Sequence, residues 1–142
     1  MKEIIEKINT EAFCDYSSNT VSNDELEKFS DLVLNIYGVQ LDESYLKFIS
    51  GINGFELNGL NFYGTKEQPE IYILSSFKQN DFWKAELPGL SDYYLLGDGD
   101  MDFYCFDSKC REFIILTKNF LQEMSRSSSF SDFIDELMNI YL

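Results

Sequence analysis

The stretch DESYLKFISGINGFELNGLNF, residues 42–62, decides the fold, because its apolar residues change from helical to alternating spacing. Asp42 is a residue type that caps helices, since its carboxylate accepts a hydrogen bond from a free backbone N–H of the first turn. Leu41 can pack on Leu46 across that cap. The sequence therefore predicts a helix that ends at Asn53-Gly54 and whose inner stripe is Tyr45, Phe48, Ile49 and Ile52.

The second half of this stretch predicts a β-hairpin. Its apolar residues alternate with polar ones around Asn58-Gly59, and Asn-Gly in that setting is the strongest short hairpin signal. In a two-residue turn Leu57 faces Leu60. The next pair on the same face is then Phe55 and Phe62. We expect the preceding helix to cover this apolar face.

A second helix is predicted upstream, from Ser22 to Tyr37. Ser22 and Glu25 match a capping box, in which each side chain accepts a hydrogen bond from the backbone N–H of the other residue. Gly38 supplies a C-terminal stop, because glycine adopts the left-handed conformation without strain. The apolar residues that should form the inner stripe are Leu26, Phe29, Val33 and Ile36.

The remaining segments predict further helices and strands. Residues 70–83 are ambiguous, although Pro69 near the start and apolar residues at helical spacing favour a helix through Ile71, Leu74 and Phe77. The turn Asp107–Cys110 should join the last two of three strands, which are Tyr93–Leu96, Met101–Phe106 and Glu112–Thr117. The serine-rich segment Ser125–Ser131 is expected to be a short loop. Ser129 should cap a final helix with the stripe Phe130, Phe133, Ile134, Leu137, Met138 and Tyr141.

This order of elements predicts the α+β class. Strands that follow one another through tight turns pair antiparallel, so we expect a mixed, mostly antiparallel sheet flanked by helices. Nothing in the sequence marks a domain boundary, and we find no internal repeat. We therefore predict a single domain over residues 1–142, in which N-terminal helices within 1–38 pack on a core at 39–142.

The composition excludes several functions. The 142 residues include 11 lysines and arginines against 25 aspartates and glutamates, and the net charge of −14 argues against binding nucleic acid or an anionic membrane. Without histidine the chain has no Ser-His-Asp or Cys-His catalytic unit. Its three cysteines are too few for an all-cysteine zinc site, and their odd number without a secretion signal predicts reduced thiols in the cytoplasm. No cofactor is expected.

Four segments together resemble the SUKH superfamily, of the SMI/KNR type. The helix Tyr45–Gly54, which runs directly into a hairpin, resembles the family's Y..F....NG element. Tyr94–Gly97 resembles the strand before the family's glycine-containing turn, and Phe103–Asp107 resembles its strand that ends in aspartate. Ser129–Leu137 resembles its closing SF..FL..L helix. The resemblance spans the chain from Asp42 to the C-terminus.

The resemblance implies a mixed sheet packed against helices and a non-catalytic function. Bacterial members of the family include immunity proteins, which bind and neutralise a polymorphic toxin, whereas eukaryotic members resemble regulatory scaffolds. We therefore predict a cytoplasmic immunity protein for a contact-dependent or secreted toxin, with a basic nuclease as the expected toxin and a monomer or weak dimer as the expected state. The alternative is a regulatory or scaffold module of the same family that binds cellular proteins.

An acidic, aromatic-rich stretch is the candidate contact region for such a toxin. From Glu86 to Asp107 there are six acids and no lysine or arginine. Acidic clusters steer basic partners and aromatic residues supply much of the affinity at protein interfaces. The expected partner-binding residues are Trp83, Glu86, Asp92, Asp98, Asp100, Asp102 and Tyr104. The competing interpretation is that Asp98-Gly99-Asp100 is only a turn and that the aromatic residues are core.

Metal and catalytic interpretations of the same acids are weaker. Asp98, Asp100 and Asp102 stand at alternate positions, as calcium ligands do, but the sixth position from Asp98 is Phe103 instead of glycine and the twelfth is Lys109 instead of glutamate. A carboxylate pair could serve glycoside hydrolysis, but 25 acids place some pair at a suitable distance by chance.

Two cysteines flank the predicted turn after the second of the three strands. Cys105 shares a strand face with Met101 and Phe103 and is expected to be a buried, small apolar residue. Cys110 stands between Lys109 and Arg111, which could lower the pKa of its thiol. A redox role for this pair is the alternative interpretation.

Overall fold

The computed structural model describes all of residues 1–142. The chain forms one sheet with helices on both of its sides. The α-helices are α1 (Lys2–Glu11), α2 (Asn23–Tyr37), α3 (Glu43–Gly51), α4 (Ser76–Glu86) and α5 (Phe130–Tyr141), and the 3-10 helices are η1 (Pro69–Ile71) and η2 (Pro88–Leu90). The strands are β1 (Phe55–Leu57), β2 (Leu60–Phe62), β3 (Tyr93–Asp98), β4 (Asp102–Asp107), β5 (Glu112–Thr117) and β6 (Glu123–Ser127). The predicted α+β class is confirmed.

The strands lie in the sheet in their sequence order, from β1 at one edge to β6 at the other. Every neighbouring pair of strands is antiparallel. The parallel element is limited to an isolated bridge between Gly64 and Ser75, outside the named strands. The sheet is thus antiparallel throughout, including the pair β2 and β3, which are joined by the long segment that contains α4.

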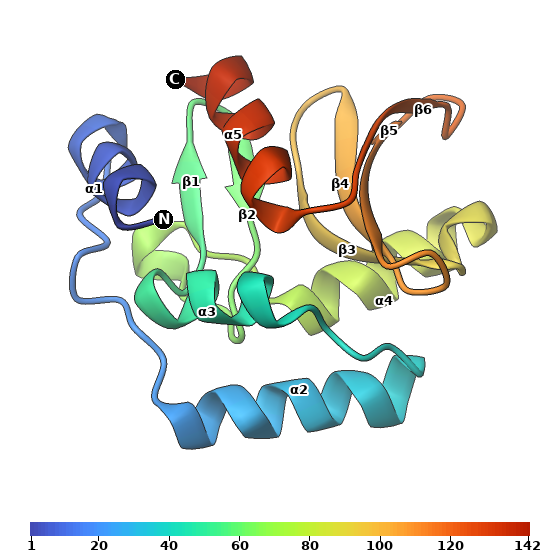
Figure 1. Ribbon diagram of the computed structural model, residues 1–142, viewed down its shortest axis with the longest axis horizontal. Helices are drawn as coiled ribbons and strands as arrows, with labels where there is room; N and C mark the ends of the chain where they lie inside the picture. Colours follow the sequence, from blue (N-terminus) through green and yellow to red (C-terminus); the bar gives the residue numbers. More distant parts are fainter.

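Both faces of the central strands are covered. Figure 1 shows α5 in front of the strands and α4 behind them, with α2 along the lower edge. The larger hydrophobic cluster contains Tyr104 and Phe106 of β4 together with residues of α1, α2, α3 and α5. The smaller cluster contains Phe103 and Cys105 of the same strand, with Trp83 of α4 packed against it. Because alternate residues face opposite sides, β4 is buried on both.

The predicted hairpin is confirmed residue by residue. Leu57 pairs with Leu60 and Phe55 with Phe62, and the two phenylalanine rings stack with centroids 5.2 Å apart. Phe48 of α3 lies over this face, with its ring centroid 5.6 Å from that of Phe62. All four hairpin side chains are buried, so α3 covers the face that the alternation marks as apolar.

The predicted N-cap residues accept the expected hydrogen bonds, but the reciprocal bond of the capping box, from the Ser22 N–H to the Glu25 side chain, is absent. The hydroxyl of Ser22 accepts a hydrogen bond from the Glu25 N–H at 3.2 Å, and the Asp42 carboxylate accepts one from the Tyr45 N–H at 3.1 Å. Ser129 caps α5 in the same way, by accepting from the Asp132 N–H. Gly38 ends α2 with φ +70. Local side-chain chemistry therefore sets these helix ends.

One residue of the predicted α2 stripe faces solvent. Ile36 is 58% exposed, whereas Phe29 and Val33 are buried. Tyr37 takes its place, since its ring packs against Phe77 at 6.3 Å and against Tyr94 at 5.6 Å. The buried row therefore follows the i, i+4, i+8 positions, and the expectation that Ile36 points inward is wrong.

Two predicted segments differ from the structure. Pro69 begins the short η1, but α4 begins only at Ser76, where the Ser75 hydroxyl accepts from the Lys78 N–H. Residues 123–127, expected to belong partly to a loop, form the edge strand β6, which pairs with β5. A polar sequence can form a strand at a sheet edge, because one neighbour supplies the backbone partners and the other side faces water.

Asn53-Gly54 fixes the path of the chain between α3 and β1. The buried Asn53 side chain donates to the Thr65 hydroxyl at 2.9 Å and accepts from the Thr65 N–H at 2.8 Å. Gly54 has φ +83, and a Cβ at this position would lie 2.7 Å from the Gly64 nitrogen. Asparagine thus ties the β2–α4 connection to α3, and glycine allows the two backbones to approach closely.

Candidate partner-binding surface

The structure divides the predicted acidic stretch between the two ends of β3. Asp92 precedes the strand and Asp98 is its last residue. Six residue steps along a strand span roughly 20 Å, so these two acids lie far apart. Asp92 also pairs with Lys109, with Nζ 3.3 Å from Oδ1. The structure therefore places these two predicted contact residues at opposite ends of β3, because the extended backbone separates residues that are close in sequence.

Asp98 is the most enclosed of the predicted site residues that carry a charge. It is 7% exposed, and its Oδ1 accepts a hydrogen bond from the Tyr63 hydroxyl at 2.6 Å. Its Oδ2 lies 2.6 Å from the Lys118 ammonium group. Burial, and then the neighbouring Asp98 carboxylate, raise the pKa of the Tyr63 hydroxyl well above its usual range. Both oxygens of Asp98 are thus engaged inside the protein.

Asp100 and Asp102 lie on the turn between β3 and β4. The Gly99 N–H donates to the Asp102 carbonyl oxygen at 2.9 Å, which closes this turn. Asp100 is exposed, and Asp102 is half-buried, so that burial raises the pKa of its carboxyl group. No ion pair engages either carboxylate. Glu86, in the last turn of α4, is also exposed and outside any ion pair.

The two predicted aromatic contacts differ in accessibility. Trp83 is half-buried and packs edge-on against Phe103, with ring centroids 4.9 Å apart, while the Lys118 ammonium group lies 4.9 Å from its ring. Tyr104 is fully buried, and its hydroxyl pairs with that of Tyr141 at 2.5 Å. Tyr104 therefore belongs to the core, which leaves no surface of its ring for a partner.

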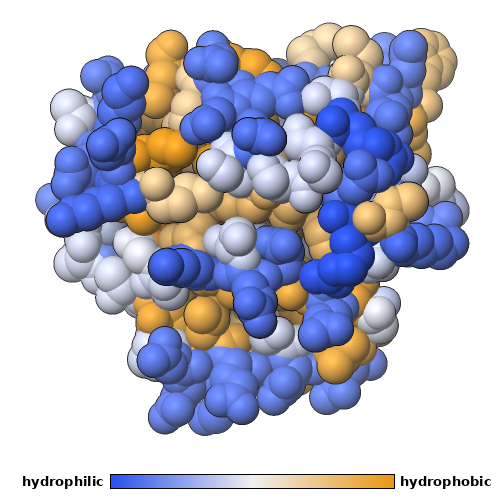
Figure 2. Space-filling model, viewed as in Figure 1, coloured by the Kyte–Doolittle hydropathy of each residue, from blue (hydrophilic) through white to orange (hydrophobic).

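Sequence reasoning missed three exposed apolar side chains beside these residues. Phe82 is 53% exposed, Met101 is 71% exposed and Phe120 is 84% exposed. Figure 2 shows apolar residues at the upper right of the molecule, over the ends of β4 and β6. We call the set around this end of the sheet the turn surface, and it consists of Phe82, Trp83, Asp100, Met101, Asp102, Lys118 and Phe120.

Lys118 connects the parts of the turn surface. Its backbone N–H donates to the Met101 carbonyl oxygen at 2.8 Å, which joins the β5–β6 connection to the β3–β4 turn. Its side chain lies over Trp83, whose ring contacts that of Phe82 with centroids 5.1 Å apart. Phe120 follows two residues later. The sequence signal for Phe120 is an apolar residue in the short connection between two strands. That connection can be seen in the sequence only if residues 123–127 are recognised as a strand.

The structure offers no cluster suited to a metal. No three acidic or cysteine side chains lie close enough together to hold a metal ion. The three cysteines are free, and burial raises the pKa of the Cys105 thiol well above its usual range. Cys105 is fully buried, whereas Cys110 is exposed.

None of the helices combines the length and the apolar character needed to cross a membrane.

Comparison with known proteins identifies the family. Residues 20–136 match the SMI1 / KNR4 family (SUKH-1), a range that begins before α2 and ends within α5. YrhA, an uncharacterized protein of Escherichia coli (strain K12), is 30% identical over 95 residues, which cover 64% of this chain and 67% of YrhA. The match extends over most of the fold, and the chain belongs to the SMI1 / KNR4 family (SUKH-1).

Proposed function

We propose that this protein is an immunity protein that binds a basic toxin domain and neutralises it stoichiometrically, without catalysis. Its family includes immunity proteins, and its net charge of −14 complements a basic partner. A nuclease is the toxin we favour, because its cationic substrate surface would meet carboxylates in place of phosphates. The protein would act in the cytoplasm, as a monomer or weak dimer.

The observation that carries this proposal is the combination of groups on the turn surface. Phe82, Met101 and Phe120 expose apolar area that a partner could bury, and aromatic anchors dominate the energetics of many interfaces. Asp100 and Asp102 stand beside them outside any ion pair, although the Lys118 ammonium group favours the ionised form of Asp102, and the two carboxylates would steer a basic protein. Docking here would block the active site of the toxin or cover its substrate surface.

Co-expression tests the function directly. The full chain should rescue growth of cells that express the C-terminal domain of the toxin encoded beside it, and the two purified proteins should form a one-to-one complex. Rescue by far fewer copies of the chain than of the toxin would reveal catalysis and contradict the stoichiometric mechanism. Absence of both rescue and complex formation would reject the immunity function.

Two variants test the surface. Phe120→Ser and Met101→Ser should each weaken the complex about tenfold or more, because they remove apolar contact area at its centre. Ile36→Ser is the matched control, since Ile36 is 58% exposed on α2, away from the turn surface. Equal losses for the control and the two test variants would show that the toxin does not dock at the turn surface.

A further inference from the structure

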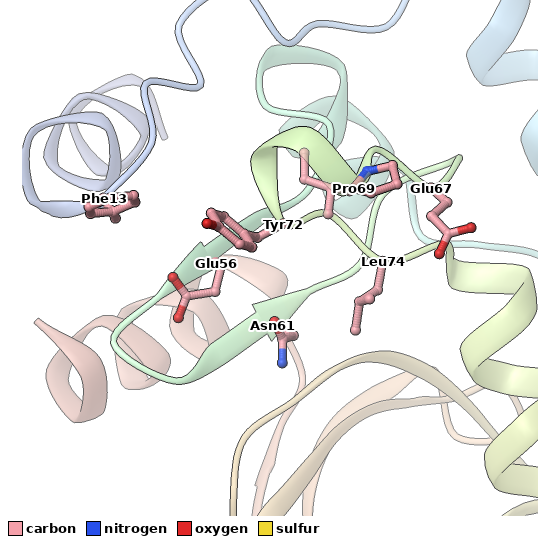
Figure 3. A pocket seen from close by; sticks show the side chains of 8 residues that line it. Phe13, Glu56, Asn61, Glu67, Pro69, Tyr72 and Leu74 are labelled. Carbon is pink, nitrogen blue, oxygen red and sulfur yellow. The ribbon is translucent and has the colours of Figure 1, made fainter.

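A second candidate contact site lies beside the β1–β2 hairpin, outside the turn surface. A cavity of about 600 Å³ is lined by Phe13, Glu56, Asn61, Glu67, Tyr72 and Leu74, among others. Glu56 and Asn61 alternate with the buried hairpin residues and so face the opposite side of the hairpin from α3. Figure 3 shows the Phe13 and Tyr72 side chains on one side of the cavity, with the Glu56 carboxylate close to the space between them.

The cavity displays two aromatic rings that the fold leaves largely uncovered. Phe13 is 88% exposed and Tyr72 is 56% exposed, and their rings meet edge to face with centroids 6.4 Å apart. Tyr72 adopts φ +62, a left-handed backbone conformation that glycine would take without strain. The chain thus accepts local strain at the position that carries one of the two rings, and such strain is typical of functional sites.

The charge of the cavity is negative. Its lining residues include Glu56 and Glu67 but no lysine or arginine. Glu67 is paired with Lys78, whose Nζ lies 2.5 Å from its Oε2. Glu56 forms no ion pair, and its Oε1 accepts one hydrogen bond, from the Gly59 N–H at 3.1 Å. One carboxylate in the cavity therefore lacks a cation, and its second oxygen accepts no hydrogen bond from another group of the protein.

We propose that this cavity receives an arginine side chain of the protein partner. The aliphatic stem would lie against Phe13 and Tyr72, and the guanidinium group would meet the Glu56 carboxylate. Guanidinium groups stack on aromatic faces and form charge-assisted hydrogen bonds with carboxylates, so both features of the cavity select the same side chain. That the partner is a basic toxin rests on the proposed function. The preference of the cavity for a guanidinium group is independent of the proposed function.

A small probe tests the cavity without the toxin. We expect n-butylguanidinium to shift the backbone amide resonances of Glu56, Asn61 and Tyr72 in a saturable manner. The neutral isostere n-butylurea should bind about tenfold more weakly, because it cannot form the charged contacts. Equal affinities for the two probes would overturn the proposal. Resonance shifts at surface acids outside the cavity, in place of shifts at Glu56, Asn61 and Tyr72, would overturn it as well.

Variants assign the binding to named side chains. Glu56→Gln keeps the acceptor for Gly59 and should weaken n-butylguanidinium binding about tenfold. Glu70→Gln removes the same charge from an exposed residue of η1 outside the lining and should leave binding unchanged. Tyr72→Gly removes the ring at a backbone conformation that glycine favours, so the fold should persist while binding weakens. Unchanged binding in both Glu56→Gln and Tyr72→Gly would reject the site.

The outcomes separate the two proposals. If n-butylguanidinium binds as expected but the toxin neither binds nor is neutralised, the cavity assignment stands and the immunity function fails. If the toxin binds and is neutralised, but Glu56→Gln and Tyr72→Gly leave its affinity unchanged, the immunity function stands and the arginine assignment fails.

Discussion

The Lys118 ammonium group lies 2.6 Å from Oδ2 of Asp98, and this ion pair joins the end of β3 to the connection after β5. The other oxygen of Asp98 accepts a hydrogen bond from the Tyr63 hydroxyl. Asp98 therefore stands in the middle of an acidic sequence but acts as an internal partner. Its structural contribution can be separated experimentally from that of Asp100, which is two residues away and exposed.

Replacing Asp98 with asparagine should lower the free energy of unfolding by about 1–3 kcal/mol, because Lys118 then loses its anion at a poorly hydrated position. Urea titration followed by the fluorescence of Trp83 measures this difference. Asp100→Asn makes the same chemical change at an exposed position and should alter stability by no more than about 0.5 kcal/mol. Equal effects of the two substitutions would contradict the assignment of Asp98 as a structural residue.

Gly54→Ala should destabilise the fold more than Gly38→Ala. Both glycines have positive φ, but a Cβ at Gly38 would have nothing within 4 Å, whereas one at Gly54 would meet the Gly64 backbone at 2.7 Å. The strain common to both is about 1–2 kcal/mol, and forced repacking at Gly54 should add about 1–3 kcal/mol. Unfolding free energies of the two variants give the comparison, and a smaller loss for Gly54→Ala would disprove the close-approach argument.

The features that could be predicted from sequence are those with local causes. Ser22, Asp42 and Ser129 each cap a helix through a side chain that bonds a backbone N–H three residues later. Asn58-Gly59 fixes the hairpin register, since a two-residue turn leaves one pairing of the flanking residues. The family could be predicted because four short segments, from Tyr45–Gly54 to Ser129–Leu137, occur in the family's order.

The features that escaped prediction depend on distant partners. β6 is a strand because β5 lies beside it, and its own residues carry little strand preference. The acidic stretch has no cation within it, yet Lys118 reaches Asp98, and the Arg126 guanidinium lies 3.6 Å from Asp107. A sequence of acidic residues does not reveal which lysine or arginine side chains of neighbouring strands will lie beside them in the fold.

Asp100→Asn combined with Asp102→Asn should slow association with the toxin by about 2- to 10-fold and reduce the dependence of the rate on salt, with a smaller effect on dissociation. Stopped-flow mixing at several ionic strengths measures both rates. The matched control is Glu27→Gln with Asp31→Asn, which removes two charges from exposed positions on α2. If the control slows association equally, only the net charge matters and the position of the acids does not.

The folded protein should lose stability as the pH rises above about 10, because the fold raises the pKa of most of its tyrosine hydroxyls. Burial is the largest cause of the raised pKa for Tyr16, Tyr37, Tyr45, Tyr63, Tyr93, Tyr94, Tyr104 and Tyr141. In the unfolded chain these hydroxyls ionise near pH 10, whereas burial raises the pKa of Tyr16 to about 12. Between those values the folded state binds more protons than the unfolded state, so the free energy of unfolding falls with rising pH. Below about pH 9 both states are protonated, and the tyrosines contribute no pH dependence.

Spectrophotometric titration of tyrosinate checks this expectation, with the same chain in concentrated urea as the control. The urea-unfolded chain should titrate all of its nine tyrosines together near pH 10. The native chain should titrate only a small fraction there, and the rest should ionise abruptly as the fold is lost, since a buried phenolate lacks the solvation that water would give it. Gradual ionisation of most native tyrosines near pH 10, with the circular dichroism unchanged, would show that their hydroxyls are hydrated instead of buried. Tyr104→Phe removes one ionisable hydroxyl from the core and keeps the packing of the ring. This variant should therefore stay folded to a higher pH than the unsubstituted chain.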